Sequence, residues 1–160
     1  MLTSQLKKLK KFSLIIMCGL PFSGKTQVSK MLENFMPAVR ISFDEIWVNS
    51  IKMQGDISWE VIRNICKNLI KDELIKGSIV VYDDTNSTLI MRDEITSIAN
   101  SLGLLSCVLY LNISTNDLSK RIEQNKIDKF HHEVADYELT KVKISFEVPT
   151  KLENLINYKF

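Results

Sequence analysis

The sequence predicts an α/β domain of three layers, in which helices cover both faces of a mainly parallel sheet of about five strands. Strand-like and helix-like segments alternate from one end of the chain to the other, as in repeated βαβ units. The strand-like segments are strongly apolar, as is usual for strands that are buried on both faces. The chain has 160 residues, 25% of them charged, and no repeat or linker divides it. Residues 1–160 are therefore expected to form one globular domain.

The expected strands are short apolar runs bounded by turn residues. In chain order they cover residues 12–18, 38–42, 78–82, 104–111 and 155–160. The expected helices show apolar residues at helical spacing, and Pro37, Gly77, Gly103 and Pro149 end four of them. They cover residues 24–35, 44–53, 57–76, 91–102, 114–124 and 137–148. Residues 125–136 are polar and carry no clear periodicity, so no element is assigned to them.

Composition excludes several classes of protein. The net charge of +2 is too small to indicate a nucleic-acid or membrane partner unless charge gathers locally. The apolar run at residues 14–18 is far too short to span a bilayer, and no membrane association is expected. Cys18, Cys66 and Cys107 are odd in number and lie in apolar runs, which favours reduced core thiols and a cytoplasmic protein. No obligatory protein partner is evident.

A phosphate-binding loop follows the first strand. The pattern G-x-x-x-x-G-K-[ST] is matched by Gly19, Leu20, Pro21, Phe22, Ser23, Gly24, Lys25 and Thr26. The glycines let backbone N–H groups curl around phosphate oxygens at the start of a helix. In this motif Lys25 would contact the β- and γ-phosphates of ATP, and the Thr26 hydroxyl would coordinate Mg²⁺. The sequence therefore predicts a P-loop NTPase domain that uses ATP and Mg²⁺.

A GTPase is the first alternative for a P-loop protein. The string Asn125-Lys126-Ile127-Asp128 fits the base-reading pattern N-K-x-D of that class. It follows a charged helical segment, however, and not a buried strand. No D-x-x-G follows a strand either, so the GTPase interpretation is rejected.

Acidic residues follow two further strands. Asp83 and Asp84 come where the strand at 78–82 ends, and Asp44 follows the strand at 38–42. Ligands of parallel sheets bind along this carboxyl edge, to which the first strand also delivers the phosphate loop. A carboxylate there can hold Mg²⁺ through its water shell, or take the proton of an attacking hydroxyl. Such residues also serve as turn formers, and Asp44 could simply cap its helix.

The motifs together resemble the polynucleotide-kinase-like P-loop kinases, a group that includes 5′-hydroxyl polynucleotide kinase domains and small kinases of unassigned substrate. The resemblance covers residues 12–155 and rests on four blocks of sequence. These are the phosphate loop, S-x-D at Ser42 and Asp44, D-D-T-N at residues 83–86 with Arg92 downstream, and F-E-x-P-x-x-x-E at Phe146, Glu147, Pro149 and Glu153. It implies a nucleoside- or nucleotide-kinase-like domain with a small lid.

The resemblance also implies residue roles. Asp44 would be the general base for the acceptor hydroxyl, and either Asp83 or Asp84 would lie beside the metal. Thr85 and Asn86 would shape the pocket, and Arg92 would bind the acceptor or brace the site.

A lid at about residues 121–136 would bring Arg121 over the phosphates. Kinases of the family that this sequence resembles usually have a second lid arginine about one turn later. This sequence has Asn125 at that position, with Lys126 and Lys129 close by. Lysine offers a point charge in place of a bidentate fork.

The leading hypothesis is a kinase that transfers the γ-phosphate of Mg-ATP to a hydroxyl acceptor. The acceptor could be a polynucleotide 5′-end, a nucleoside or a small metabolite. The alternative is a regulatory, non-catalytic ATP-binding module that acts through a partner. A phosphorylating toxin of the P-loop type would share the same active-site logic.

Overall fold

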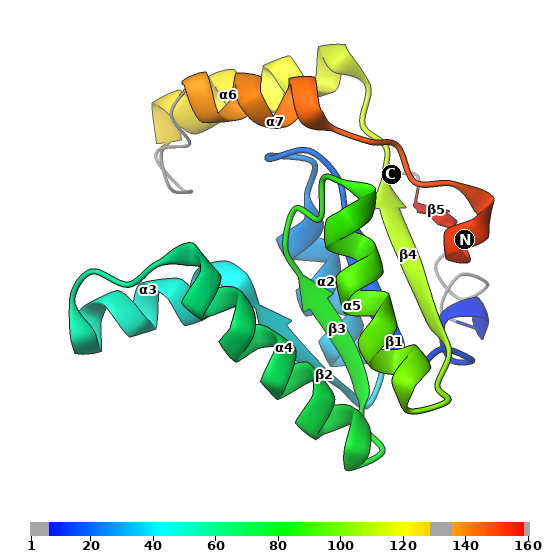
Figure 1. The fold of residues 1–160 in the computed structure, drawn as a ribbon. Coiled ribbons are helices and arrows are strands. Elements are labelled where there is room, and N and C mark those ends of the chain that lie inside the picture. Colours follow the sequence, from blue (N-terminus) through cyan, green and yellow to red (C-terminus); the bar gives the residue numbers. More distant parts are fainter. Residues whose placement is uncertain (1–6, 129–135, 159–160) are drawn as a thin grey trace.

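The protein is described here by a computed structural model, which describes residues 7–128 and 136–158 (Figure 1). Its sheet has five strands in the order β2-β3-β1-β4-β5, and every neighbouring pair is parallel. The strands are β1 (Leu14–Cys18), β2 (Ala38–Ser42), β3 (Ile79–Asp83), β4 (Ser106–Leu111) and β5 (Ile156–Tyr158). All five lie within or close to the predicted runs, and the predicted α/β fold class is confirmed.

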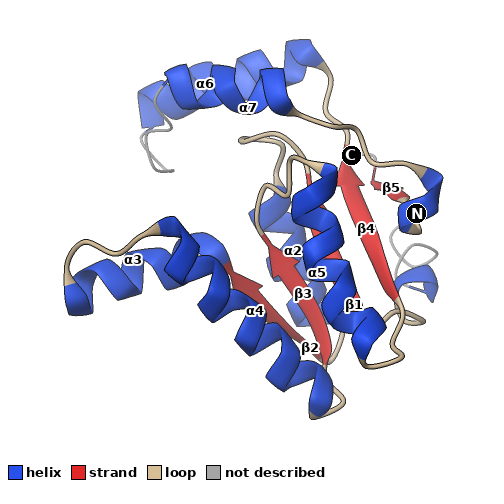
Figure 2. Ribbon diagram, in the orientation of Figure 1, coloured by secondary structure: helices blue, strands red, loops and turns tan. Residues whose placement is uncertain are grey.

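Helices connect the strands (Figure 2). They are α2 (Lys25–Phe35), α3 (Phe43–Gln54), α4 (Trp59–Ile75), α5 (Leu89–Ser101), α6 (Thr115–Asp128) and α7 (Asp136–Ser145), with a 3₁₀ turn η1 (Lys151–Glu153). Helix α6 continues past the predicted end at residue 124, so the string at residues 125–128 lies on a helix and not at a strand end. This agrees with the rejection of a GTPase. Part of the expected lid, residues 129–135, lies outside the described residues.

Two apolar clusters form the core, one on each face of the sheet. Alternate residues of β1 divide between them, because successive side chains of a strand point to opposite faces. Helices α4 and α5 cover one face, where Ile62, Ile70 and Ile95 meet the sheet. Helix α2 covers the other face through Val28 and Leu32. The result is the predicted three-layer arrangement.

The three cysteines are buried and free, one on each of β1, α4 and β4. Burial raises the pKa of each thiol to about 12, so none is a ready nucleophile. Among the described residues, no helix is long and apolar enough to cross a membrane.

Aromatic rings join α3 to α4. Trp59 stacks on Phe43 at 5.1 Å and on Trp47 at 4.9 Å between ring centroids. Phe43 is buried, whereas Trp59 at the start of α4 remains 53% exposed. The stack fixes the first turns of α3 against α4, close to the carboxyl edge of the sheet (Figure 1).

Candidate active site

The phosphate loop runs from the end of β1 into α2. Gly19 has φ 156° and Gly24 has φ 96°, conformations that favour glycine. A Cβ at Gly19 would lie 2.7 Å from Ser23 Oγ and 3.1 Å from the carbonyl oxygen of Leu111. The Gly19 N–H donates to the carbonyl of Thr85, which ties the loop to the segment after β3. These contacts hold the loop at the carboxyl edge of the sheet.

Lys25 lies at the centre of this region. Its Nζ donates to the carbonyls of Gly19 and Leu20, each at 2.9 Å. Burial lowers the pKa of Lys25 below its usual range, although Asp83, Asp84 and, more weakly, Asp44 act in the opposite direction. Carboxylates from two different strand ends therefore converge electrostatically on the phosphate-loop lysine.

The lowered pKa predicts a pH dependence of ATP affinity. A bound phosphate would raise the pKa of Lys25 again, so ATP binding should take up a proton at pH values above the free-state pKa. Affinity should be constant at lower pH and should weaken as pH rises through that value. Calorimetry in buffers of different ionisation enthalpy measures the proton uptake. Lys25→Gln should bind more weakly and lose this dependence; an unchanged pH profile in that variant would contradict the assignment.

Asp83 and Asp84 point to opposite faces of the sheet, as adjacent strand residues do. Asp83 faces α2, where its Oδ2 accepts from the Ser29 hydroxyl at 2.7 Å. Two nitrogens of Arg40 also donate to this oxygen, Nε at 3.1 Å and Nη2 at 3.0 Å. In the described part of the chain, every hydrogen bond to the Asp83 carboxylate goes to Oδ2, which leaves Oδ1 for another ligand.

Asp84 faces α4 and α5. Its carboxylate accepts from the Tyr82 hydroxyl at 3.0 Å and from the Thr85 N–H at 2.6 Å. Burial raises the pKa of Asp84 above its usual range, although these two hydrogen bonds and the charges of Arg63 and Lys25 act against that rise. The sequence could not distinguish the two acids, whereas the structure gives them different surroundings.

Asp44 is the second residue of α3 and is exposed. It does not cap the helix, because the Ser42 hydroxyl accepts from the Glu45 N–H at 3.4 Å and takes that position. The simple structural explanation of Asp44, an N-cap, is therefore wrong. Its carboxylate lies near enough to Lys25 to influence that residue's pKa.

Asn86 and Arg92 are buried side by side, and each is only 1% exposed. The Asn86 amide donates to the carbonyl of Met17 at 2.7 Å, and Arg92 Nη1 donates to the carbonyl of Asn86 at 3.0 Å. Arg92 also pairs with Glu153 at 2.5 Å. Of the two roles predicted for Arg92, this enclosure favours bracing the site.

The motif at residues 146–153 attaches the C-terminal segment to this brace. Glu153 accepts from the Thr150 N–H at 2.8 Å as well as pairing with Arg92. The Glu147 carboxylate accepts from the Leu89 N–H, and Phe146 stacks on Tyr110 at 5.9 Å. The segment therefore fixes the start of α5.

Arg121 reaches the phosphate loop from α6. Its Nη1 donates to the carbonyls of Ser23 at 3.0 Å and Phe22 at 3.3 Å. The predicted lid arginine and the loop are thus in direct contact. Lys129 lies outside the described residues. That Lys126 or Lys129 takes the place of the absent second lid arginine stays a prediction.

A family model matches residues 12–152 of the chain, and its description is chromatin associated protein KTI12. The chain belongs to the KTI12 family. Among curated proteins, none matches the chain. The KTI12 match spans the phosphate loop, all three acids, Arg92 and Arg121.

Solved structures resemble the fold. Kti12 of Chaetomium thermophilum in complex with ADP-AlF3 has a TM-score of 0.74 at 18% identity, over 91% of this chain and 88% of that one. The Pnkp1/Rnl/Hen1 RNA repair complex has a chain with a TM-score of 0.67 at 17% identity, over 82% of this chain and 43% of that one. A gluconokinase from Sinorhizobium meliloti 1021 has a TM-score of 0.64 at 16% identity, covering 89% and 79%. These likenesses confirm the kinase-like P-loop fold of this KTI12 family member.

The residues present fit a magnesium ion beside a bound nucleotide. Mg²⁺ in P-loop proteins rests on one or two protein ligands together with phosphate oxygens and water. Thr26 lies in the first turn of α2, and the Ser29 hydroxyl lies 3.1 Å from its carbonyl and 2.7 Å from Asp83. Asp83 therefore lies beside the helix turn that carries Thr26. No cluster of three or more His, Cys, Asp or Glu ligands occurs within the described residues, and such a site does not need one.

Sequence reasoning missed the groups that hold the two acids. Arg40 lies on β2 opposite Val81, on the same face as Asp83. It was detectable as the one charged residue in an otherwise apolar strand, since a charge buried there needs a partner. Arg63, on a surface-like position of α4, carried no such signal.

Replacing Arg121 by alanine should reduce turnover on the order of 10²-fold, with a smaller loss of ATP affinity. The reason is that a cation over the loop matters most when charge develops on the transferring phosphoryl group. Single-turnover rates and equilibrium binding of ATP separate the two effects. Lys120→Ala, one residue earlier and exposed on α6, is the control. Equal losses in rate and affinity would show that Arg121 contributes ground-state binding alone.

Proposed function

We propose that this KTI12 family member is an ATP-dependent kinase that transfers the γ-phosphate of Mg-ATP to a hydroxyl group of an acceptor. The observation that supports the proposal is that Asp83 and Asp84 stand at the end of β3, and Asp44 follows β2, at the sheet edge that holds the phosphate loop. All three charges also raise the pKa of Lys25 against the effect of its burial. A nucleotide-binding module needs the lysine and one metal-side acid, whereas a kinase also needs a carboxylate where the acceptor approaches. Asp44 is exposed at the start of α3, directly after β2.

The proposed roles divide along the sheet edge. Residues 19–26 hold the phosphates, with Lys25 at the β- and γ-phosphates. Thr26 and Asp83 hold Mg²⁺, which supplies charge neutralisation on the phosphate oxygens. Asp44 takes the proton from the acceptor hydroxyl, whose oxygen then forms the new bond to phosphorus while ADP leaves. Arg121 balances charge on the transferred group, and Asp84 and Thr85 line the acceptor side.

ATP binding is supported by the complex of Chaetomium thermophilum Kti12 with ADP-AlF3. The acceptor is open between a polynucleotide 5′-end, a nucleoside and a small metabolite. The second candidate function is a regulatory ATP-binding or ATP-hydrolysing module, which is favoured by the description of the family as chromatin associated. The three buried thiols favour a reducing compartment, and we propose the cytoplasm.

One experiment separates the two functions. The protein is incubated with Mg²⁺ and γ-labelled ATP, with and without 5′-hydroxyl oligonucleotides, nucleosides and small alcohols. A kinase moves the label to an acceptor and hydrolyses ATP slowly without one. Release of labelled phosphate at a rate that no acceptor changes would instead identify an ATPase module and overturn the proposal.

Asp44→Asn should lower transfer by about 10²- to 10⁴-fold while ATP affinity changes little, because the amide keeps the shape but cannot accept the proton. Replacing Asp83 and Asp84 together by Asn should instead raise the Mg²⁺ concentration needed for activity and also slow turnover. Magnesium titrations of initial rates distinguish the variants. Glu33→Gln, exposed on α2, is the control. Loss of ATP affinity in Asp44→Asn would remove Asp44 from the acceptor side.

A further inference from the structure

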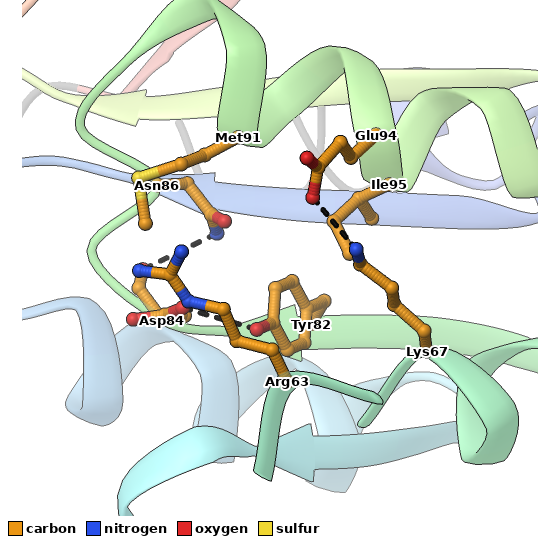
Figure 3. Close-up of a pocket in the computed structure, with 8 residues that line it drawn as sticks. All are labelled: Arg63, Lys67, Tyr82, Asp84, Asn86, Met91, Glu94 and Ile95. Carbon is orange, nitrogen blue, oxygen red and sulfur yellow. Dashed lines mark hydrogen bonds and ion pairs between the residues drawn. The ribbon is translucent and has the colours of Figure 1, made fainter. Parts of the chain in front are cut away.

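A small hollow opens between the end of β3 and helices α4 and α5 (Figure 3). It has room for about one water molecule. Its lining comprises Arg63, Lys67, Tyr82, Asp84, Asn86, Met91, Glu94 and Ile95. Asp84 is one wall of the hollow, and the carbonyl of the next residue, Thr85, accepts from the Gly19 N–H of the phosphate loop. The hollow therefore adjoins the proposed phosphoryl-transfer site on the side away from α2.

Arg63 lines this hollow and has an unused donor. Its Nε is buried and has no hydrogen-bond partner among the described residues. Figure 3 shows the guanidinium beside Asp84. A buried donor without a partner destabilises a fold, so such groups are few in native proteins and often await water or a ligand. Lys67 differs, because it already pairs with Glu94 at 2.7 Å.

The charges around the hollow determine what it can accept. Arg63 and Lys67 contribute two positive charges, and Asp84 and Glu94 contribute two negative ones, so the lining is neutral in sum. An anion would meet the Asp84 carboxylate, and a cation would meet Arg63. A hydroxyl group suits both, because its oxygen accepts from Arg63 Nε while its proton is donated to Asp84. It also matches the hollow in size.

We propose that this hollow binds a second hydroxyl of an uncharged polyhydroxylated acceptor, such as a sugar, a polyol or the ribose of a nucleoside. This inference rests on the proposed kinase function and names its substrate class. Arg63 and Asp84 would orient the acceptor through that hydroxyl, and another hydroxyl of the same molecule would receive the phosphoryl group. Arg63 thus becomes a specificity-determining residue on α4.

The test measures binding of the acceptor and not its phosphorylation, so its result can be interpreted even if the protein transfers no phosphate. Saturation-transfer NMR records the binding of D-ribose, myo-inositol and D-ribose 5-phosphate to the full chain with Mg²⁺ and a non-hydrolysable ATP analogue. Arg63→Met removes the donor, and Arg63→Gln restores an N–H without the charge. Lys71→Met is the matched control, since it is exposed on the same helix and does not line the hollow. Thermal melts and ATP-analogue affinity verify that each variant is folded.

The expected result is saturable binding of at least one neutral polyol, weakened about tenfold in Arg63→Met, partly recovered in Arg63→Gln and unchanged in Lys71→Met. Three outcomes would overturn the proposal. The first is wild-type polyol affinity in Arg63→Met, which would show that the hollow holds a structural water and not the acceptor. The second is binding of D-ribose 5-phosphate but of no neutral polyol, which would show that the site prefers an anionic ligand. The third is no neutral polyol binding while the ATP analogue still binds.

Discussion

Replacing Lys25 by alanine is expected to reduce phosphoryl transfer on the order of 10³-fold or more. The side chain is half-buried within the phosphate loop, and its Nζ is held 2.9 Å from two loop carbonyls. A bound nucleotide would replace these neutral oxygens by charged phosphate oxygens. In so enclosed a site a lost positive charge is poorly compensated by water. Transfer of labelled phosphate under single-turnover conditions measures the loss.

Lys30→Ala provides the matched control for Lys25→Ala. Lys30 lies on the same helix, α2, but its side chain is 57% exposed and only approaches Glu45 at 3.9 Å. It should retain nearly full activity. Near-wild-type activity in Lys25→Ala would show that the loop does not act on a phosphate at all.

Replacing Arg92 by methionine is expected to lower the free energy of unfolding by about 3–5 kcal/mol. Methionine fills much of the same volume, but it leaves the Glu153 carboxylate with no cation in an enclosed position. The carbonyl of Asn86 also loses its donor at 3.0 Å. Since small domains are stable by only about 5–15 kcal/mol, the variant should be marginally folded. Urea unfolding followed by circular dichroism measures the change.

Two companion variants define what the Arg92 experiment tests. Lys67→Met breaks the partly exposed pair with Glu94 and should cost less than about 1 kcal/mol. Adding Glu153→Gln to Arg92→Met should recover part of the lost stability, because the uncompensated charge is then removed. A single Arg92→Met variant as stable as the wild type would mean that the C-terminal segment is not anchored through this pair.

Local patterns in the sequence predicted most of the fold. The five predicted runs became the five strands. The signal is clearest for the central strands β1, β3 and β4, because strands covered on both faces are apolar almost throughout. Helix ends were less predictable: α6 continues through residue 128, since its polar face carries no signal that marks a terminus. Helix α7 ends at Ser145, whereas the sequence predicted a helix through residue 148, and the difference has a tertiary cause. Residues 146–147 leave α7 to pack Phe146 on Tyr110 and to cap α5.

The site was only partly predictable for a similar reason. The phosphate loop and the acids follow from positions at strand ends, which a sequence displays. Which acid faces which helix depends on the register of β3 between β2 and β1. The pairs Arg40–Asp83 and Arg92–Glu153 join residues 43 and 61 positions apart. No single-sequence pattern encodes such distant partners.

The ring stack between α3 and α4 gives the molecule a built-in optical probe. The chain has only 2 tryptophans, and both belong to this stack, with centroids 4.9 Å apart. Indoles held so close couple their excited states, so the near-ultraviolet circular dichroism of the native protein should be dominated by one exciton pair. Trp47 lies one helical turn after Asp44 on α3. Any shift of the helix that carries the proposed base, as an acceptor arrives, would change the intensity of that pair without any added label.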